Sequence, residues 1–89
     1  MPVTRSAEKR MRQTITRTAR NRRVKSMVKT ATRRFEEALQ SGDRELARNR
    51  LIAAIRRIDQ AAAKGVIHKN NAARKKSRLT RLFNQNAAG

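Results

Sequence analysis

The stretch QSGDRE, residues 40–45, decides the fold because it joins two helix-like segments through a glycine. Gly42 suits the left-handed residue that closes a helix, and Asp43 suits the N-cap of the helix that follows. A second glycine, Gly65 in AAKGVIH, closes the next segment in the same way. The two glycines therefore predict three helices, at about 6–40, 44–64 and 68–85.

Apolar side chains recur at helical spacing in all three segments. They step by threes and fours, as one face of a helix does, whereas β-branched residues are scattered and never alternate for long. We therefore expect an all-α fold, in which the first two segments form an antiparallel hairpin and the third covers it. The apolar positions are Val24, Val28, Ala31, Phe35, Ala38 and Leu39, then Ala47, Leu51, Ala54, Ile55, Ile58 and Ala62, and finally Ala72, Leu79, Leu82 and Phe83.

The first two segments differ in length. At 1.5 Å per residue, the first helix runs about 50 Å and the second about 30 Å, so the second cannot cover the start of the first. The predicted organisation is one helical RNA-binding domain over 1–89, a three-helix bundle at about 24–85 with a protruding basic extension at about 1–23. So short a chain has little material for a core, and we expect binding to add stability to a marginal bundle.

The charge indicates the partner. Lys and Arg total 24 against 6 Asp and Glu, for a formal net charge of +18. A polyanion neutralises this self-repulsion, which makes nucleic acid the first class to consider. With two Phe and no Trp or Tyr, modules that stack unpaired bases on aromatic platforms are disfavoured. An Arg-rich, acid-poor N-terminus is also typical of organellar transit peptides, but here the same charge density continues to the far end.

The extension has its cations spread around the whole helix circumference, which is a poor arrangement for a membrane surface. Glu8 is the sole acid among the first 35 residues. Like charges at i,i+4 spacing oppose helix formation, so we expect this half to fray when free and to become ordered among phosphates. Four of the other five acids gather near Gly42, and that end of the hairpin should face away from a polyanion. They are Glu36, Glu37, Asp43 and Glu45.

A second basic segment follows Gly65. Val66 and Ile67 suit the apolar contact that accompanies a glycine cap, and His68 then lies near the start of the third helix. Free N–H groups at a helix start favour an anion, and Lys69 adds a cation there. A lone His without Cys makes a metal site improbable.

These residues also carry a resemblance. SAEKR at 6–10, the SGD turn and above all AAKGVIHKNNAARKKSRLTRLFN at 62–84 resemble the family of bacterial small-subunit ribosomal protein twenty. The resemblance implies a three-helix bundle with an extended basic first helix. It also implies direct binding to 16S ribosomal RNA, low on the body of the small subunit, and a part in its assembly. The matching positions are Lys64, Gly65, His68, Lys69, Asn70, Ala72, Ala73, Arg74, Lys76, Ser77, Arg78 and Leu79.

The expected partner is thus 16S ribosomal RNA in the cytoplasmic small ribosomal subunit, bound through its phosphate backbone. We expect no cofactor, metal, small-molecule substrate, membrane contact or homo-oligomer. The predicted RNA-binding residues are Arg5, Lys9, Arg10, Arg12, Arg17, Arg20, Arg22, Arg23, Lys25, Lys29, Lys64, His68, Lys69, Asn70, Asn71, Arg74, Lys75, Lys76 and Arg78.

Two other functional classes compete with this interpretation. A non-specific nucleoid or DNA-binding protein remains the alternative, although neither a recognition helix after a short turn nor a dimer seam is evident. An enzyme is disfavoured because the glycines are isolated and the adjacent Glu36 and Glu37 point about 100° apart on a helix. Asp59 follows Arg56 by three residues, so we expect a surface ion pair between them.

Overall fold

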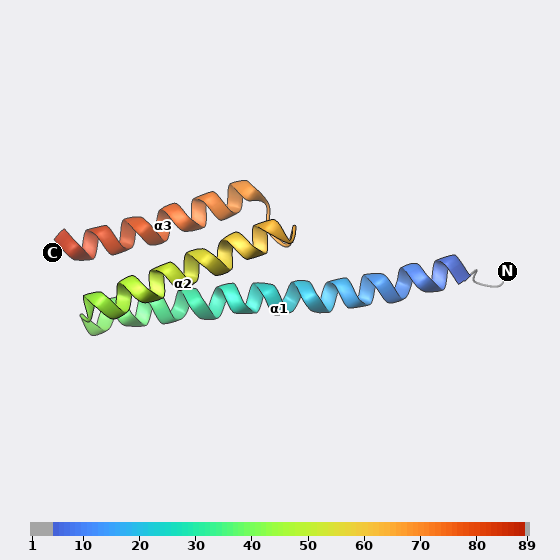
Figure 1. Cartoon of the computed structure of the whole chain (residues 1–89), viewed down its shortest axis with the longest axis horizontal. Coiled ribbons are helices and arrows are strands. Elements are labelled where there is room, and N and C mark those ends of the chain that lie inside the picture. Colours follow the sequence, from blue (N-terminus) through green and yellow to red (C-terminus); the bar gives the residue numbers. More distant parts are fainter. Residues whose placement is uncertain (1–4, 89) are drawn as a thin grey trace.

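The structure, a computed structural model, describes the backbone of residues 5–88, which form three α-helices and their connections. The helices are α1 (Arg5–Ser41), α2 (Arg44–Ala63) and α3 (Lys69–Ala88). The molecule is elongated, with dimensions of 66 × 22 × 15 Å (Figure 1). The predicted all-α bundle with a long first helix is confirmed.

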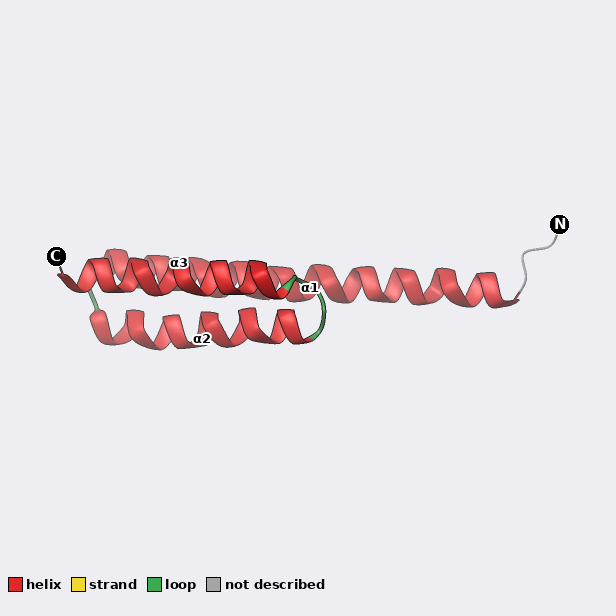
Figure 2. Ribbon diagram, turned by 90° about the horizontal axis from the view of Figure 1, so that it is seen from above, coloured by secondary structure: helices red, strands yellow, loops and turns green. Residues whose placement is uncertain are grey.

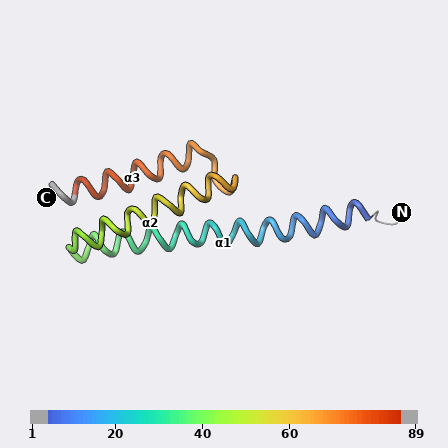
Figure 3. The backbone as a smooth tube through the Cα atoms, in the orientation of Figure 1, coloured from blue at the N-terminus to red at the C-terminus, as the bar shows by residue number. Residues whose placement is uncertain are grey.

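Helix α2 lies at the centre of the bundle. It runs back along the C-terminal half of α1, and α3 then returns along α2 (Figures 1 and 2). α2 packs closely on both neighbours, whereas α1 and α3 touch little. The backbone trace in Figure 3 shows the N-terminal half of α1 continuing past the α2–α3 connection without another helix beside it.

The core begins at Val24 and follows the predicted apolar stripes. Phe35 and Ile58 are its largest fully buried side chains, each with 0% of its surface exposed. Ala61 is also fully buried, although the stripe was predicted to continue at its neighbour Ala62, which is half-buried. The buried residues are Val24, Val28, Phe35, Ala38, Ala47, Leu51, Ala54, Ile58, Ala61, Ala72 and Leu79.

The SGD turn has the geometry predicted for it. Gly42 has a φ of 80°, in the left-handed region, and its N–H donates to the carbonyl of Leu39 at 3.2 Å. Asp43 is the N-cap of α2, since its Oδ1 accepts a hydrogen bond from the N–H of Leu46 at 3.0 Å. The turn therefore reverses the chain within two residues and brings α2 onto α1.

The second connection is also closed by its glycine. Gly65 has a φ of 74°, and the N–H of Val66 donates to the carbonyl of Ala61 at 2.9 Å. Val66 and Ile67 are half-buried against the core, as expected for the apolar residues after a glycine cap. The glycine cap therefore ends α2 and turns the chain toward the start of α3.

Besides the apolar core, an ion pair and a cation–π contact between described side chains join α3 to α2. Lys76 Nζ lies 2.8 Å from Asp59 Oδ1, and the Arg44 guanidinium lies 4.7 Å from the centre of the Phe83 ring. The expected pair between Asp59 and Arg56 was therefore wrong. Lys76 reaches Asp59 because α3 packs directly on α2, a relationship that spacing along α2 alone does not reveal.

Candidate nucleic-acid interface

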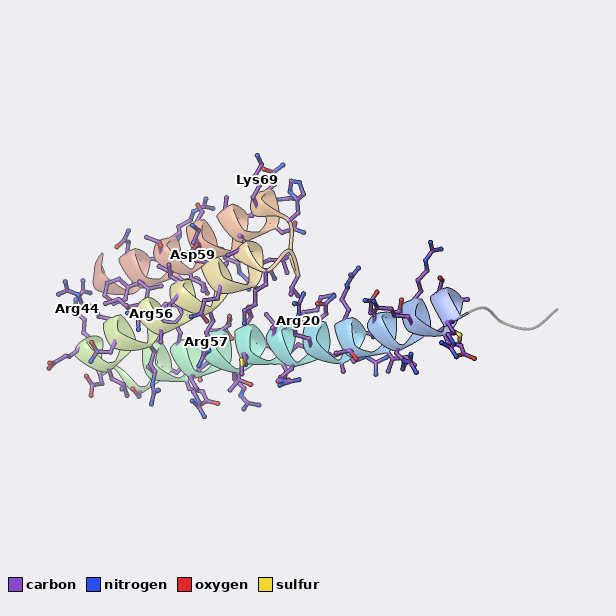
Figure 4. The ribbon with its side chains drawn as sticks, turned by 45° about the vertical axis from the view of Figure 1, so that its right-hand side comes forward. Arg20, Arg44, Arg56, Arg57, Asp59 and Lys69 are labelled. Carbon is purple, nitrogen blue, oxygen red and sulfur yellow. The ribbon has the colours of Figure 1, made fainter. Side chains whose placement is uncertain are left out.

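The basic extension is the most exposed part of the molecule. Every side chain from 8 to 20 is exposed, and Figure 4 shows them projecting from α1 in all directions. Thr16 uses its hydroxyl to donate to the carbonyl of Arg12 at 3.0 Å, within the helix. Residues 1–4 of the predicted extension lie outside the described residues. Its predicted contact residues are Arg5, Lys9, Arg10, Arg12, Arg17, Arg20, Arg22 and Arg23.

A groove runs along α1 from the end of the extension into the bundle, between α1 and the segment formed by the α2–α3 connection and the first two turns of α3. We call it the corner groove; it has a volume of about 750 Å³ and an apolar floor that includes Val28 and Ile67. Four of the predicted RNA-binding residues, from two helices, meet around it. The lining residues are Arg22, Lys25, Ser26, Val28, Lys29, Thr32, Arg33, Glu36, Ile67 and Lys75.

Polar side chains at the start of α3 hydrogen-bond to its backbone and to one another. His68 Nδ1 accepts a hydrogen bond from the N–H of Asn70 at 3.1 Å, so the imidazole caps the helix. One turn on, Arg74 Nη2 donates to Asn71 Oδ1 at 3.2 Å. The amide of Asn71 thereby orients a guanidinium on the exposed surface.

The remaining predicted cations around α3 do not share one environment. Lys64, Lys69 and Arg78 are exposed, and Figure 4 places Lys69 at the outer end of α3, away from α1. Lys76 is instead occupied by Asp59 on α2. The structure thus brings Lys75 together with α1, while Lys69 faces a different direction.

Four of the six acidic residues, Glu36, Glu37, Asp43 and Glu45, lie near the end of the molecule opposite the extension. Asp43 and Glu45 flank the start of α2 at the α1–α2 turn, which lies at the far end of the long axis (Figure 1). On α1 next to this turn, Arg33 Nε is 3.8 Å from Glu37 Oε1. Acids are therefore concentrated near the α1–α2 turn, whereas the described part of the extension contains a single acid, Glu8.

A further group of arginines was missed from the sequence. Arg34, Arg50 and Arg57 line a groove between α1 and α2, together with Arg23, which was predicted. Arg50 and Arg57 stand seven residues apart on α2, a spacing that places them on one face of a helix. That signal was present, but the face of α1 opposite them becomes known only from the packing.

Residues 5–88 contain no helix that is long and apolar enough to cross a membrane. Within the same part of the chain, no three His, Cys, Asp or Glu side chains gather where they could hold a metal ion.

Comparison with known proteins agrees with the resemblance seen in the sequence. The family model described as ribosomal protein S20 matches residues 2–84. A small ribosomal subunit protein bS20 of Natranaerobius thermophilus is 59% identical over 88 residues, covering 99% of this chain and 100% of the relative. The protein of the same name from Pelotomaculum thermopropionicum is 55% identical over 85 residues, covering 96% and 97%. On both grounds, the chain belongs to the ribosomal protein S20 family.

Proposed function

We propose that this protein binds 16S ribosomal RNA directly through the phosphate backbone and helps to assemble or stabilise the small ribosomal subunit. The observation that carries the proposal is the corner groove, where Arg22, Lys25 and Lys29 of α1 meet Lys75 of α3. These cations come from distant parts of the sequence, and the packing of the helices brings them around one groove. The partner is a polyanion because the chain carries a net charge of +18.

Family membership supports the ribosomal setting. The relatives are named as small ribosomal subunit proteins, and this chain matches them over nearly its whole length. The chain is accordingly a ribosomal protein and not an enzyme, and it works in the bacterial ribosome in the cytoplasm. We assign RNA binding to the whole chain as one domain, with residues 1–23 as the extension and 24–85 as the bundle.

The proposed contacts fall into three sets. The extension is contacted by phosphates on all sides, because its cations point in every direction. Each Arg can engage two phosphate oxygens with its planar guanidinium group. The corner groove holds backbone between α1 and α3, and the start of α3 presents Lys69, Asn70 and an oriented Arg74. Lys76 contributes least, because Asp59 already neutralises it.

The test compares the affinity for a 16S ribosomal RNA fragment with that for random duplex DNA over a salt series. With about ten phosphates contacted, log K falls against log salt with a slope of about −7 to −9, and ribosomal RNA is preferred at every salt concentration. Equal affinity for the two nucleic acids would favour a non-specific DNA-binding protein instead. A slope of about −2 would refute the wide phosphate footprint.

A pair of matched variants tests the corner groove itself. Lys25→Gln with Lys29→Gln removes two charges from the groove, whereas Arg48→Gln with Arg56→Gln removes two from the exposed surface of α2, outside its lining. We expect the first pair to lower the magnitude of the slope of log K against log salt by about 1.4–1.8, and the second pair to lower it less. Equal effects of the two pairs would mean that net charge, and not the groove, determines binding.

A further inference from the structure

The groove between α1 and α2 that sequence reasoning missed is lined by four arginines, and we call it the arginine groove. It has a volume of about 380 Å³ and lies between Arg23 and Arg34 of α1 and Arg50 and Arg57 of α2. The other lining residues are Ser26, Met27, Thr30, Ala31 and Ala53.

The arrangement follows from helical spacing on both walls. Arg23 and Arg34 stand eleven residues apart, about three turns and some 16 Å along α1. Arg50 and Arg57 stand seven residues apart on α2, two turns and about 10 Å. The guanidinium groups therefore line a strip long enough for several backbone phosphates of one strand. Between them the floor is formed by small or flexible apolar side chains, and Ser26 and Thr30 add hydroxyl groups.

One of the arginines is held in place across the groove. Arg57 Nη1 lies 3.8 Å from Met27 Sδ on α1 and 3.4 Å from Gln60 Oε1 on its own helix. Figure 4 shows Arg57 at the seam between α1 and α2. Holding a long side chain in position before binding reduces the entropy lost when a ligand arrives. The guanidinium still has further N–H groups for an anion.

The arginines of the arginine groove have no carboxylate partner among its lining residues. Among residues 5–85, whose side chains the structure describes, those that line the groove include no carboxylate. The corner groove, by contrast, includes Glu36. The ion pairs between described side chains use Arg33 and Lys76 and none of these four arginines. Four guanidinium groups gathered without an acid repel one another unless an anion enters.

We infer that the arginine groove is a second binding site for the sugar–phosphate backbone of RNA, distinct from the corner groove. The inference rests on the proposed function for the identity of the nucleic acid. Arginine forks match phosphate oxygens, and the two hydroxyls on the α1 wall suit ribose 2′-OH groups. Ser26 lines both grooves, so the two sites flank α1 on either side of that residue.

The decisive experiment uses the full-length chain and a 16S ribosomal RNA fragment. Arg50→Gln with Arg57→Gln removes both α2 arginines of the groove; Arg48→Gln with Arg56→Gln removes the same charge from the same helix outside it. We expect the groove variant to bind at least about tenfold more weakly and to reduce the salt slope by about 1.4–1.8. Losses no larger than those of the control pair would overturn the inference.

A third variant separates charge from packing. Arg50→Lys with Arg57→Lys keeps both charges and should retain the wild-type salt slope while losing part of the affinity, because lysine lacks the two-pronged fork. A slope as low as that of the glutamine variant would trace the loss to disturbed packing and overturn the inference. Circular dichroism melting of each variant shows whether the bundle is intact.

Chemical modification of arginines tests the same point in the wild-type protein. With phenylglyoxal and mass spectrometry, Arg50 and Arg57 should react in the free protein and be protected in the RNA complex, while Arg48 and Arg56 react in both. If the RNA is bound and preferred over DNA yet Arg50 and Arg57 react equally in both states, this inference fails and the proposed function stands. If the RNA is not preferred over DNA, the proposed function fails, whatever the modification pattern.

Discussion

Lys76 Nζ on α3 lies 2.8 Å from Asp59 Oδ1 on α2, so one of the cations predicted to bind RNA is used to hold two helices together. Both side chains remain partly exposed, at 37% for Lys76 and 54% for Asp59. An ion pair of such exposure contributes about 0.2–1 kcal/mol. The pair therefore contributes little to the free energy of folding of the bundle and mainly helps to fix the position of α3 on α2.

This gives a first prediction for Lys76. Lys76→Gln should lower the free energy of unfolding by at most about 1 kcal/mol, and the affinity for the RNA fragment should fall less than in Arg78→Gln, whose cation is exposed. Chemical denaturation and filter binding measure the two effects. An affinity loss in Lys76→Gln as large as that in Arg78→Gln would show that Lys76 leaves Asp59 for a phosphate.

The sequence predicted the helices and their turns because these depend on local chemistry. Gly42, Asp43 and Gly65 have the conformations and caps that their residue types favour, and helix bounds differ from prediction by three residues or fewer. The partner of Asp59 and the arginine groove could not be predicted in this way. Both depend on which face of one helix meets another, and periodicity within a single helix does not fix that relationship.

A second prediction concerns Gly65, whose left-handed backbone begins the turn into α3. A Cβ at this position meets nothing within 4 Å, so the cost of substitution comes from the φ of 74° and not from a clash. We expect Gly65→Asn to be tolerated best, Gly65→Ala to cost about 1 kcal/mol and Gly65→Val to cost more, because β-branching disfavours this region.

Thermal melts of the three Gly65 variants provide the measurement, with Gly42→Ala as a matched control. Gly42 also has open space around a φ of 80°, so its alanine variant should lose a similar amount. If all three Gly65 variants melted at the wild-type temperature, the left-handed cap would contribute nothing to stability.

A third prediction concerns the core. Phe35→Ala removes a ring with no exposed surface and should cost about 3–5 kcal/mol, enough to unfold a small bundle in isolation. Ile58→Val, at an equally buried site, should cost about 0.5–1.5 kcal/mol and leave the fold intact. Circular dichroism of the two variants shows the difference.

Binding should partly restore the Phe35→Ala variant. RNA binds the folded chain in preference to the unfolded chain, and the stabilisation grows with ligand concentration above Kd. Adding the ribosomal RNA fragment should therefore raise the helical signal of Phe35→Ala, whereas Ile58→Val gains little because it is already folded. No recovery at saturating RNA would mean that Phe35 is needed to form the binding surface itself.

The last prediction concerns the extension. The residues from 8 to 20 are all exposed, so their helix is held by its own backbone hydrogen bonds and opposed by repulsion among its cations. Phosphates relieve that repulsion, and the helical signal of the full chain should rise when RNA is added at low salt. A chain beginning at residue 24 keeps every buried residue of α1 and should show a much smaller rise. An equal rise in both chains would place the ordering in the bundle, and no rise in either would show that the extension is already helical without phosphates.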